Sequence, residues 1–266
     1  MSDNRPIGVF DSGIGGVTVL SKLAEMLPSE DFIYVGDTLN CPYGVKSSEE
    51  IADLVTNVAK FLLERDVKAI VIACNTATAN SAHLSSITDV PVVGVIEPTA
   101  NYAYKQSKNK NIAVLATNAT IDSKKYEGYL EKKRCLFKRG KRYYVKCSEF
   151  VPVVESLQMN TEYSNKVVSE KISDLKDKKI DTVILGCTHF GLLSKDILSV
   201  LPNAKLVGCG KPTGDYLIKI LEKKGLLAND KKQGNIKIYT TGDPESMVEQ
   251  ISWFDKEHEA VKKIIL

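Results

Sequence analysis

Two apolar runs, each ended by a cysteine and a small polar residue, most constrain what this 266-residue chain can fold into. The first run covers residues 69–73 and ends at Cys74, and the second covers 182–186 and ends at Cys187. Continuous aliphatic and β-branched runs are typical of strands buried inside a parallel sheet. Because open α/β sheets bind their ligands at the carboxyl ends of strands, we expect each thiol to lie at a ligand-binding edge.

The segments around these runs alternate between strand-like and helical patterns. Strands are predicted at residues 7–10, 32–35, 67–73 and 92–96, with helices in the connections. Ser47 and Glu50 have the spacing of a capping box, which predicts that a helix begins there. This repeated strand–helix alternation is typical of a mostly parallel sheet covered by helices.

The strand pattern then restarts, which indicates a second half built like the first. Residues 111–117 resemble 6–12, and residues 180–187 resemble 69–74. We therefore expect an α/β fold with two similar, mostly parallel-sheet domains that face each other across a cleft. A later helix at 215–223 and a strand at 236–240 are expected to rejoin the first half. Proline and glycine interruptions place the first domain at 1–97 plus 209–266 and the second at 98–208.

Composition narrows the class of protein. A hydrophobic content of 43% is ordinary for a globular protein, and no apolar stretch approaches the ~20 residues of a membrane span. The first residues lack an apolar signal region, so we expect a cytoplasmic protein whose six cysteines stay reduced. No Cys-x-x-Cys pair is present, and His189 with Cys187 would need two further ligands to hold zinc, so no metal is expected.

Basic residues are concentrated at positions 132–142, although the formal net charge of the chain is only +3. Such a segment can contact nucleic acid, but a charge block alone gives only non-specific attraction. We interpret it as a solvated, lysine-rich face with a hairpin-like turn at Gly140. No specific nucleic-acid partner and no membrane partner are expected.

Two thiols presented alike by two halves suggest a base on one face of a carbon atom and an acid on the other, which is the chemistry of racemisation. Cys74 is expected at a helix N-terminus, where the dipole lowers a thiol pKa, although a buried inert cysteine fits the same pattern. His189 can assist Cys187, and an extended path would place both on one side, although His189 could also be a core histidine.

Other segments offer groups for a ligand. The glycine-rich loop 11–16 fits either a small-ligand loop or a tight strand–helix turn capped by Asp11 or Ser12. Asn75 and Thr76 offer donors to a carboxylate. The long connection with Pro42-Tyr43-Gly44 either covers a site or is a simple turn. Glu155 is a surface glutamate by default. The remaining cysteines are expected to be non-catalytic: Cys41, Cys135, Cys147 and Cys209.

A series of motifs resembles the glutamate racemase family, within the aspartate/glutamate racemase superfamily. In chain order these motifs are Asp11-Ser12-Gly13-Ile14-Gly15-Gly16, Gly36-Asp37-Thr38, Pro42-Tyr43-Gly44, Cys74-Asn75-Thr76-Ala77, Gly94-Val95-Ile96-Glu97-Pro98 and Gly186-Cys187-Thr188-His189. The resemblance covers the chain to about residue 210. It implies cofactor-independent racemisation of L- and D-glutamate by an isomerase that supplies D-glutamate for peptidoglycan, and we also expect a homodimer.

The resemblance also implies residue roles. Cys74 would be the base toward D-glutamate and Cys187 the base toward L-glutamate. The residues that would assist the thiols are Asp11, Glu155 and His189. The residues that would bind substrate are Asp11, Ser12, Tyr43, Gly44, Asn75, Thr76, Thr188 and His189. No cofactor and no metal are implied.

The chain departs from the family pattern at three places: Thr99, where glycine is usual after Pro98, Phe190-Gly191, and the stretch 208–212, which lacks a usual aspartate. Two other functions remain open at this point. One is a racemase for aspartate or another amino acid. The other is a binding or redox-sensing protein in which Cys74 and Cys187 form a disulfide switch.

Overall fold

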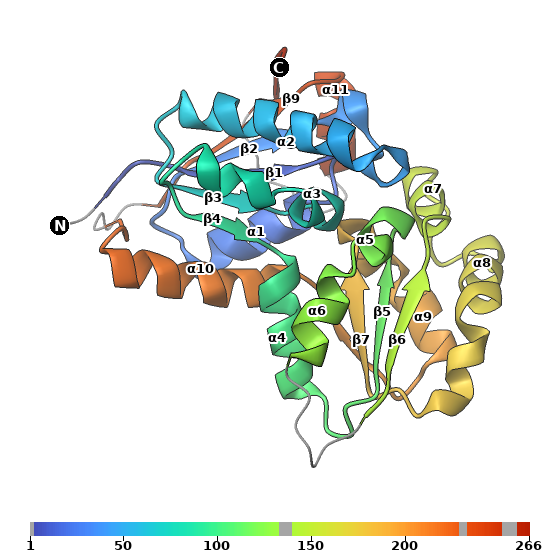
Figure 1. Ribbon diagram of the computed structural model, residues 1–266. Helices are drawn as coiled ribbons and strands as arrows, with labels where there is room; N and C mark the ends of the chain where they lie inside the picture. The colour runs from blue at the N-terminus through green and yellow to red at the C-terminus, as the bar shows by residue number, and fades with distance from the viewer. Residues whose placement is uncertain (1–2, 133–139, 229–232, 252–259) are drawn as a thin grey trace. The chain divides into compact units, whose positions relative to one another are not determined.

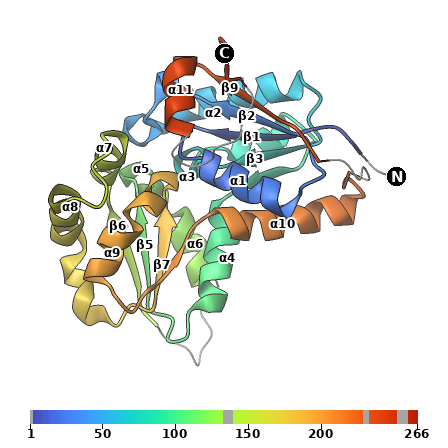
Figure 2. The ribbon, with the colours of Figure 1, turned by 180° about the vertical axis from the view of Figure 1, so that it is seen from behind.

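The computed structural model describes residues 3–132, 140–228, 233–251 and 260–266. The chain divides into two compact units, of which unit 1 contains residues 1–95 and 210–266 and unit 2 contains residues 96–209. Each unit is a parallel sheet with helices on both faces (Figures 1 and 2). The prediction of two similar, parallel-sheet α/β domains is therefore confirmed. Among the described residues, no helix is long and apolar enough to cross a membrane.

Unit 1 has a six-stranded sheet in the order β10-β9-β2-β1-β3-β4, with every neighbouring pair parallel. Strands β1, β2 and β3 are buried along their whole length, and most of their residues are aliphatic or aromatic. The tail of the chain joins this sheet through β9, which pairs with β2. The strands are β1 (Ile7–Asp11), β2 (Phe32–Gly36), β3 (Ala69–Ile72), β4 (Val92–Gly94), β9 (Ile236–Thr240) and β10 (Lys262–Lys263).

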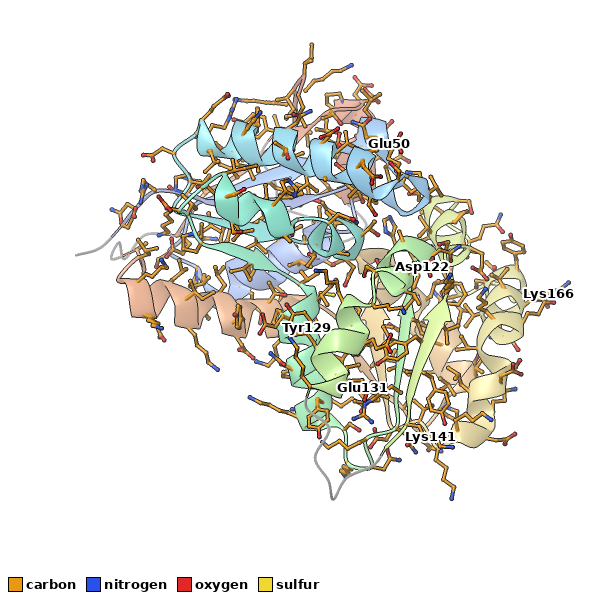
Figure 3. The ribbon with its side chains drawn as sticks, in the orientation of Figure 1. Glu50, Asp122, Tyr129, Glu131, Lys141 and Lys166 are labelled. Carbon is orange, nitrogen blue, oxygen red and sulfur yellow. The ribbon has the colours of Figure 1, made fainter. Side chains whose placement is uncertain are left out.

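The longest helix of unit 1 covers one face of this sheet, and α1 and α10 lie side by side on the other (Figures 1 and 2). That longest helix, α2, begins with the predicted capping box: Glu50 N–H donates to Ser47 Oγ at 3.2 Å, and Ser47 N–H donates to Glu50 Oε2 at 2.8 Å. Glu50 is labelled on α2 in Figure 3. The helices are α1 (Val17–Met26), α2 (Ser48–Leu63), α3 (Asn75–Ala79), α10 (Gly210–Lys224) and α11 (Pro244–Ile251), with 3₁₀ turns η1 (Thr38–Asn40), η2 (Tyr43–Val45) and η3 (Ala82–Ser86).

Unit 2 repeats the strand order of unit 1. Its sheet runs β6-β5-β7-β8, which matches β2-β1-β3-β4 strand for strand, again with all neighbours parallel. Under this match β7 corresponds to β3, so the two cysteines follow corresponding strands. The strands are β5 (Ile112–Ala116), β6 (Arg142–Lys146), β7 (Thr182–Gly186) and β8 (Lys205–Val207).

The core of unit 2 lies between its sheet and helices α7, α8 and α9. There the rings of Phe150 and Phe190 pack edge to face, with their centroids 5.2 Å apart. Helices α4 and α6 contact each other on the opposite face (Figure 1). The helices are α4 (Ile96–Gln106), α5 (Asn118–Asp122), α6 (Lys125–Glu131), α7 (Phe150–Glu155), α8 (Glu162–Ile172) and α9 (Ser194–Val200), with 3₁₀ turns η4 (Ser173–Lys178) and η5 (Thr188–Leu193).

Strand β6 departs from the sequence prediction. It pairs in parallel with β5, and the hairpin-like turn expected at Gly140 would involve residues 133–139, whose structure is not described. Arg142 is half-buried, and its Nη1 donates to the carbonyls of Lys110 and Gly140 at 2.6 Å each. Residues 133–139 of the basic segment lie outside the described residues. Of the two basic residues that follow Gly140, Lys141 is exposed (Figure 3), whereas Arg142 contributes hydrogen bonds to the fold.

Candidate active site

Cys74 lies two residues beyond β3 and caps the N-terminus of α3. Its Sγ accepts a hydrogen bond from Ala77 N–H at 3.4 Å, and Ser12 Oγ lies 3.5 Å from the same sulfur. Only 7% of the residue is exposed. The thiol is therefore buried at the carboxyl edge of the unit 1 sheet, and polar groups surround its sulfur.

Burial and, to a smaller extent, the nearby Asp11 carboxylate together raise the pKa of the Cys74 thiol to about 12. Hydrogen bonds from Ser12 and Ala77 oppose this shift but do not cancel it. The prediction of a lowered pKa is therefore wrong for this structure. Helix α3 has only five residues, so its dipole is too weak to offset desolvation of a fully enclosed thiolate.

Asp11 is the last residue of β1 and is fully buried. Its Oδ2 accepts the N–H of Gly16 at 2.6 Å, and Tyr34 O–H donates to the Gly13 carbonyl at 2.8 Å. A Cβ at Gly16 would lie 2.4 Å from the Asp11 Cβ, so glycine is required for this turn. The glycine-rich loop is thus a tight strand–helix turn that also places Asp11 and Ser12 beside Cys74.

Tyr43 belongs to the same cluster. Its O–H donates to Asp37 Oδ2 at 2.5 Å, and Asp37 Oδ1 accepts Thr241 O–H at 2.7 Å. Burial and Asp37 raise the pKa of Tyr43 far above its usual value, with smaller contributions from Cys74 and Asp11. The neighbouring candidates are Gly44, which is partly exposed in η2, and Asn75 and Thr76, which are buried in the first turn of α3.

Cys187 follows β7 directly and precedes the 3₁₀ turn η5. Its Sγ lies 3.7 Å from His189 Nδ1, within range of a thiol–imidazole hydrogen bond. The premise of an extended path through His189 is wrong, because Thr188–Leu193 form the 3₁₀ turn. The turn nevertheless brings the imidazole to the sulfur. His189 and Thr188 are both buried, at 4% and 8% exposure.

Glu155, the last residue of α7, lies on the Cys187 side. Its Oε1 is 3.7 Å from His189 Nε2, an ion-pair distance when the imidazole is protonated. Its side chain is 39% exposed, so it links the buried imidazole to solvent.

The structure adds two residues that the sequence analysis did not select. Asp37 accepts the hydrogen bond of the Tyr43 hydroxyl. Its position directly after β2 is the sequence pattern that could have marked it as a site residue. Tyr126 is buried near Cys187, and no sequence pattern marks it. Cys147 lies in the unit 2 core, and its lack of a catalytic role stays a prediction. No group of three or more His, Cys, Asp or Glu side chains is placed to hold a metal among the described residues.

The chain matches known racemases over nearly its whole length. The profile of the Asp/Glu/Hydantoin racemase family matches residues 7–209. A glutamate racemase of Pediococcus pentosaceus is 40% identical over 249 residues, which cover 93% of this chain and 93% of the relative.

Solved structures agree with this match. A crystal structure of a glutamate racemase isoform from Bacillus anthracis has a TM-score of 0.92 and 36% identity, covering 99% of this chain and 98% of that one. A glutamate racemase from Francisella tularensis, in complex with D-glutamate, has a TM-score of 0.86 and 34% identity, with the same coverage of both chains.

Two parallel α/β units, each with a cysteine at the end of a corresponding strand, define the class of protein. Together with the identity over most of the chain, they show that the chain belongs to the Asp/Glu/Hydantoin racemase family and is an amino-acid racemase.

Proposed function

We propose that this enzyme interconverts L- and D-glutamate by a two-base mechanism in which Cys74 and Cys187 act on opposite faces of the substrate Cα. One cysteine, as thiolate, removes the α-hydrogen, and the other, as thiol, donates a proton to the opposite face. The observation that carries the proposal is the position of the thiols, which follow corresponding strands of two sheets with the same strand order.

Glutamate as substrate is supported by the relatives that match this chain over most of their length, one of which is titled as a complex with D-glutamate. The residues proposed to bind its carboxylates are Ser12, Tyr43, Gly44, Asn75, Thr76 and Thr188. Donors fixed in buried positions stabilise negative charge on a carboxylate as the carbanion forms, because they need no reorganisation.

The raised pKa of Cys74 suits this chemistry. A thiolate that is desolvated and lies beside Asp11 is a stronger base than an exposed one, which favours removal of a weakly acidic α-hydrogen. The positive α-ammonium group of a bound amino acid would favour the thiolate form by direct attraction. Asp11 is thus proposed to strengthen the base and to attract the ammonium group.

On the other side, His189 is proposed to accept or return the proton of Cys187. Its Nδ1 faces the sulfur and its Nε2 faces Glu155, so a carboxylate stabilises the imidazolium when the thiolate forms. This arrangement differs from the Cys74 side, where the sulfur has hydroxyl and backbone partners. The two thiols are therefore expected to respond differently to pH.

The wider role proposed is supply of D-glutamate for peptidoglycan by a cytoplasmic homodimer that uses no cofactor. Support for this role comes from the family alone. Activity should persist after dialysis against EDTA, and the purified protein should show no pyridoxal absorbance. A loss on chelation that a metal restores would contradict the absence of a cofactor.

The test follows racemisation by circular dichroism, first with L-glutamate and then with L-aspartate. We expect turnover of glutamate, with Cys74→Ser and Cys187→Ser each reducing it by several orders of magnitude, since general acid–base groups contribute roughly 10²–10⁴-fold each. Near-normal turnover by either variant would refute the two-base mechanism. Turnover of aspartate alone would identify aspartate, and not glutamate, as the substrate. No turnover of either amino acid would favour a redox or binding role.

A further inference from the structure

Tyr126 of α6 is only 1% exposed, yet its buried hydroxyl has hydrogen-bond partners. It hydrogen-bonds to the side chains of Thr99 and Cys209. Thr99 lies in the first turn of α4, near the residue at which the chain enters unit 2, and Cys209 is the last residue of that unit. One buried hydroxyl therefore joins the segments at which unit 2 begins and ends.

The same tyrosine reaches the strand that carries Cys187. The Cys209 thiol donates to the Leu185 carbonyl in β7 at 3.6 Å. A Cβ at Gly186 would lie 3.2 Å from Tyr126 Cε2, so the ring lies directly over the residue that precedes Cys187. Burial raises the pKa of the Tyr126 phenol well above its usual value, and the Cys187 sulfur adds a smaller electrostatic contribution in the same direction.

We propose that Tyr126 is a positioning residue for Cys187, holding the end of β7 in place through its ring on Gly186 and through the hydrogen-bond chain Thr99–Tyr126–Cys209–Leu185. The proposal rests on the proposed role of Cys187 in proton transfer. Thr99 and Cys209 both fall where the sequence departs from the family pattern, and the structure shows that these departures converge on one side chain.

The physical reason is the cost of burying polar groups. Phenylalanine would fill the same space without the free-energy cost of desolvating a hydroxyl. The hydroxyl of Tyr126 therefore has to offset that cost through its hydrogen bonds. Each group in the hydrogen-bond chain from Thr99 to Leu185 has a partner. A buried network whose groups are all hydrogen-bonded fixes a single arrangement of the elements that it joins. Removal of the phenol oxygen would leave Thr99 and Cys209 without their shared partner and loosen the end of β7.

The experiment compares Tyr126→Phe with Tyr144→Phe, which removes a buried hydroxyl that has no hydrogen-bond partner among the described residues of the same unit. We expect Tyr126→Phe to lower kcat for glutamate by about 10- to 100-fold, the effect of a misplacement of up to ~1 Å, with KM little changed. Tyr144→Phe should retain wild-type kinetics.

A second readout measures the thiols themselves. Iodoacetamide labelling across pH 7–9, with peptide mass spectrometry, gives the rate of each cysteine separately. In Tyr126→Phe, Cys187 should be labelled faster than in the wild type and with an altered pH profile. Cys74 and the fully buried Cys147 should be unchanged, which distinguishes a local loosening from unfolding.

If Tyr126→Phe unfolds, which rapid labelling of Cys147 would reveal, two substitutions of Cys209 still test the proposal. Cys209→Ser retains a hydrogen-bonding group and should stay near wild type, whereas Cys209→Ala should resemble Tyr126→Phe. Wild-type kcat and wild-type Cys187 labelling in Tyr126→Phe and Cys209→Ala would overturn the proposal. Absence of racemase activity in the wild type would instead refute the proposed function, and the labelling would still test the positioning.

Discussion

Cys74 has opposing influences on its thiol, and their balance decides how it reacts in the absence of substrate. Burial and Asp11 favour the protonated form, while Ser12 and Ala77 stabilise the thiolate. The raised pKa shows that the first pair prevails. In the substrate-free enzyme Cys74 is therefore a protonated and unreactive thiol near neutral pH.

This balance predicts the pH dependence of labelling at Cys74. Because its pKa is raised to about 12, the thiolate fraction should grow about tenfold per pH unit from pH 7 to 10 without a plateau. Asp11→Asn removes the nearby negative charge, lowers the pKa of Cys74 and should speed its labelling at fixed pH, while racemisation becomes slower. Peptide mass spectrometry after iodoacetamide treatment measures the first effect.

Cys147 is the internal control for that experiment. Burial, with a smaller contribution from Glu149, raises its pKa to about 12 as well, but it lies in unit 2 and Asp11 does not contribute to the shift. Its labelling rate should be the same in Asp11→Asn and in the wild type. A plateau in the Cys74 rate near pH 8 would contradict the raised pKa.

His189 should affect one direction of proton removal more than the other. The imidazole Nδ1 lies 3.7 Å from the Cys187 sulfur, and the family resemblance leads us to propose Cys187 as the base toward L-glutamate. His189→Asn should slow early incorporation of solvent deuterium from L-glutamate more than from D-glutamate. His83→Asn, which alters a histidine bound to Thr56 in unit 1, is the matched control and should change neither. Equal slowing from both enantiomers would make His189 a general binding residue.

At the scale of elements, a buried ion pair fastens the amino ends of the unit 1 strands. Lys68 precedes β3 and pairs with Glu30, which precedes β2, and both side chains are almost completely buried. Lys68 Nζ also donates to the Asp3 carbonyl at 2.5 Å, and Glu30 Oε1 accepts Ala228 N–H at 2.8 Å. The pair thus connects four separate parts of the chain at the ends of strands that are opposite to Cys74.

Breaking this pair should destabilise unit 1 strongly. Lys68→Met leaves the Glu30 carboxylate buried and uncompensated, which typically costs about 3–5 kcal/mol in the free energy of unfolding. Adding Glu30→Gln keeps the acceptor for Ala228 and should recover most of that loss. Urea denaturation measures both.

An exposed pair supplies the comparison. Lys22 and Glu25 in α1 are 2.7 Å apart at the surface, so Lys22→Met should cost no more than about 1 kcal/mol. A loss for Lys68→Met as small as that for Lys22→Met would show that the buried pair is not needed for stability.

Elements with a local sequence signal could be predicted, and those that depend on distant partners could not. The aliphatic runs of β1, β3, β5 and β7 mark buried strands, and Ser47 with Glu50 marks the start of α2. Strand β6 was missed because its charged ends and paired tyrosines suit an edge position whose pairing is set by β5.

The site shows the same division. The position of each cysteine follows from its strand, whereas the pKa of Cys74 depends on enclosure by residues from several segments. The contact between Glu155 and His189 joins α7 to η5, and no spacing in the sequence encodes it. Tyr126 likewise gains its partners only after α4, α6 and the end of β8 have packed together.

At the scale of the whole molecule, unit 2 is continuous in sequence and unit 1 is not. We predict that residues 96–209 fold when expressed alone, because they contain a complete sheet and a core of their own. Residues 1–95 alone should remain unfolded, since they lack β9 beside β2 and α10 beside α1. Cooperative thermal unfolding followed by circular dichroism distinguishes the two fragments, and a non-cooperative 96–209 fragment would contradict the prediction.

The split of unit 1 also has a consequence during synthesis. Strand β2 pairs with β9 along its whole length, but β9 is translated only after roughly 200 further residues, about 10–40 s later at ordinary ribosome speeds. Through that interval the apolar β2 segment lacks its strand partner and stays exposed, and segments of this kind associate with other chains. We therefore expect the nascent chain to need protection from aggregation until β9 has been synthesised. Overexpression should cause aggregation through the exposed β2 segment.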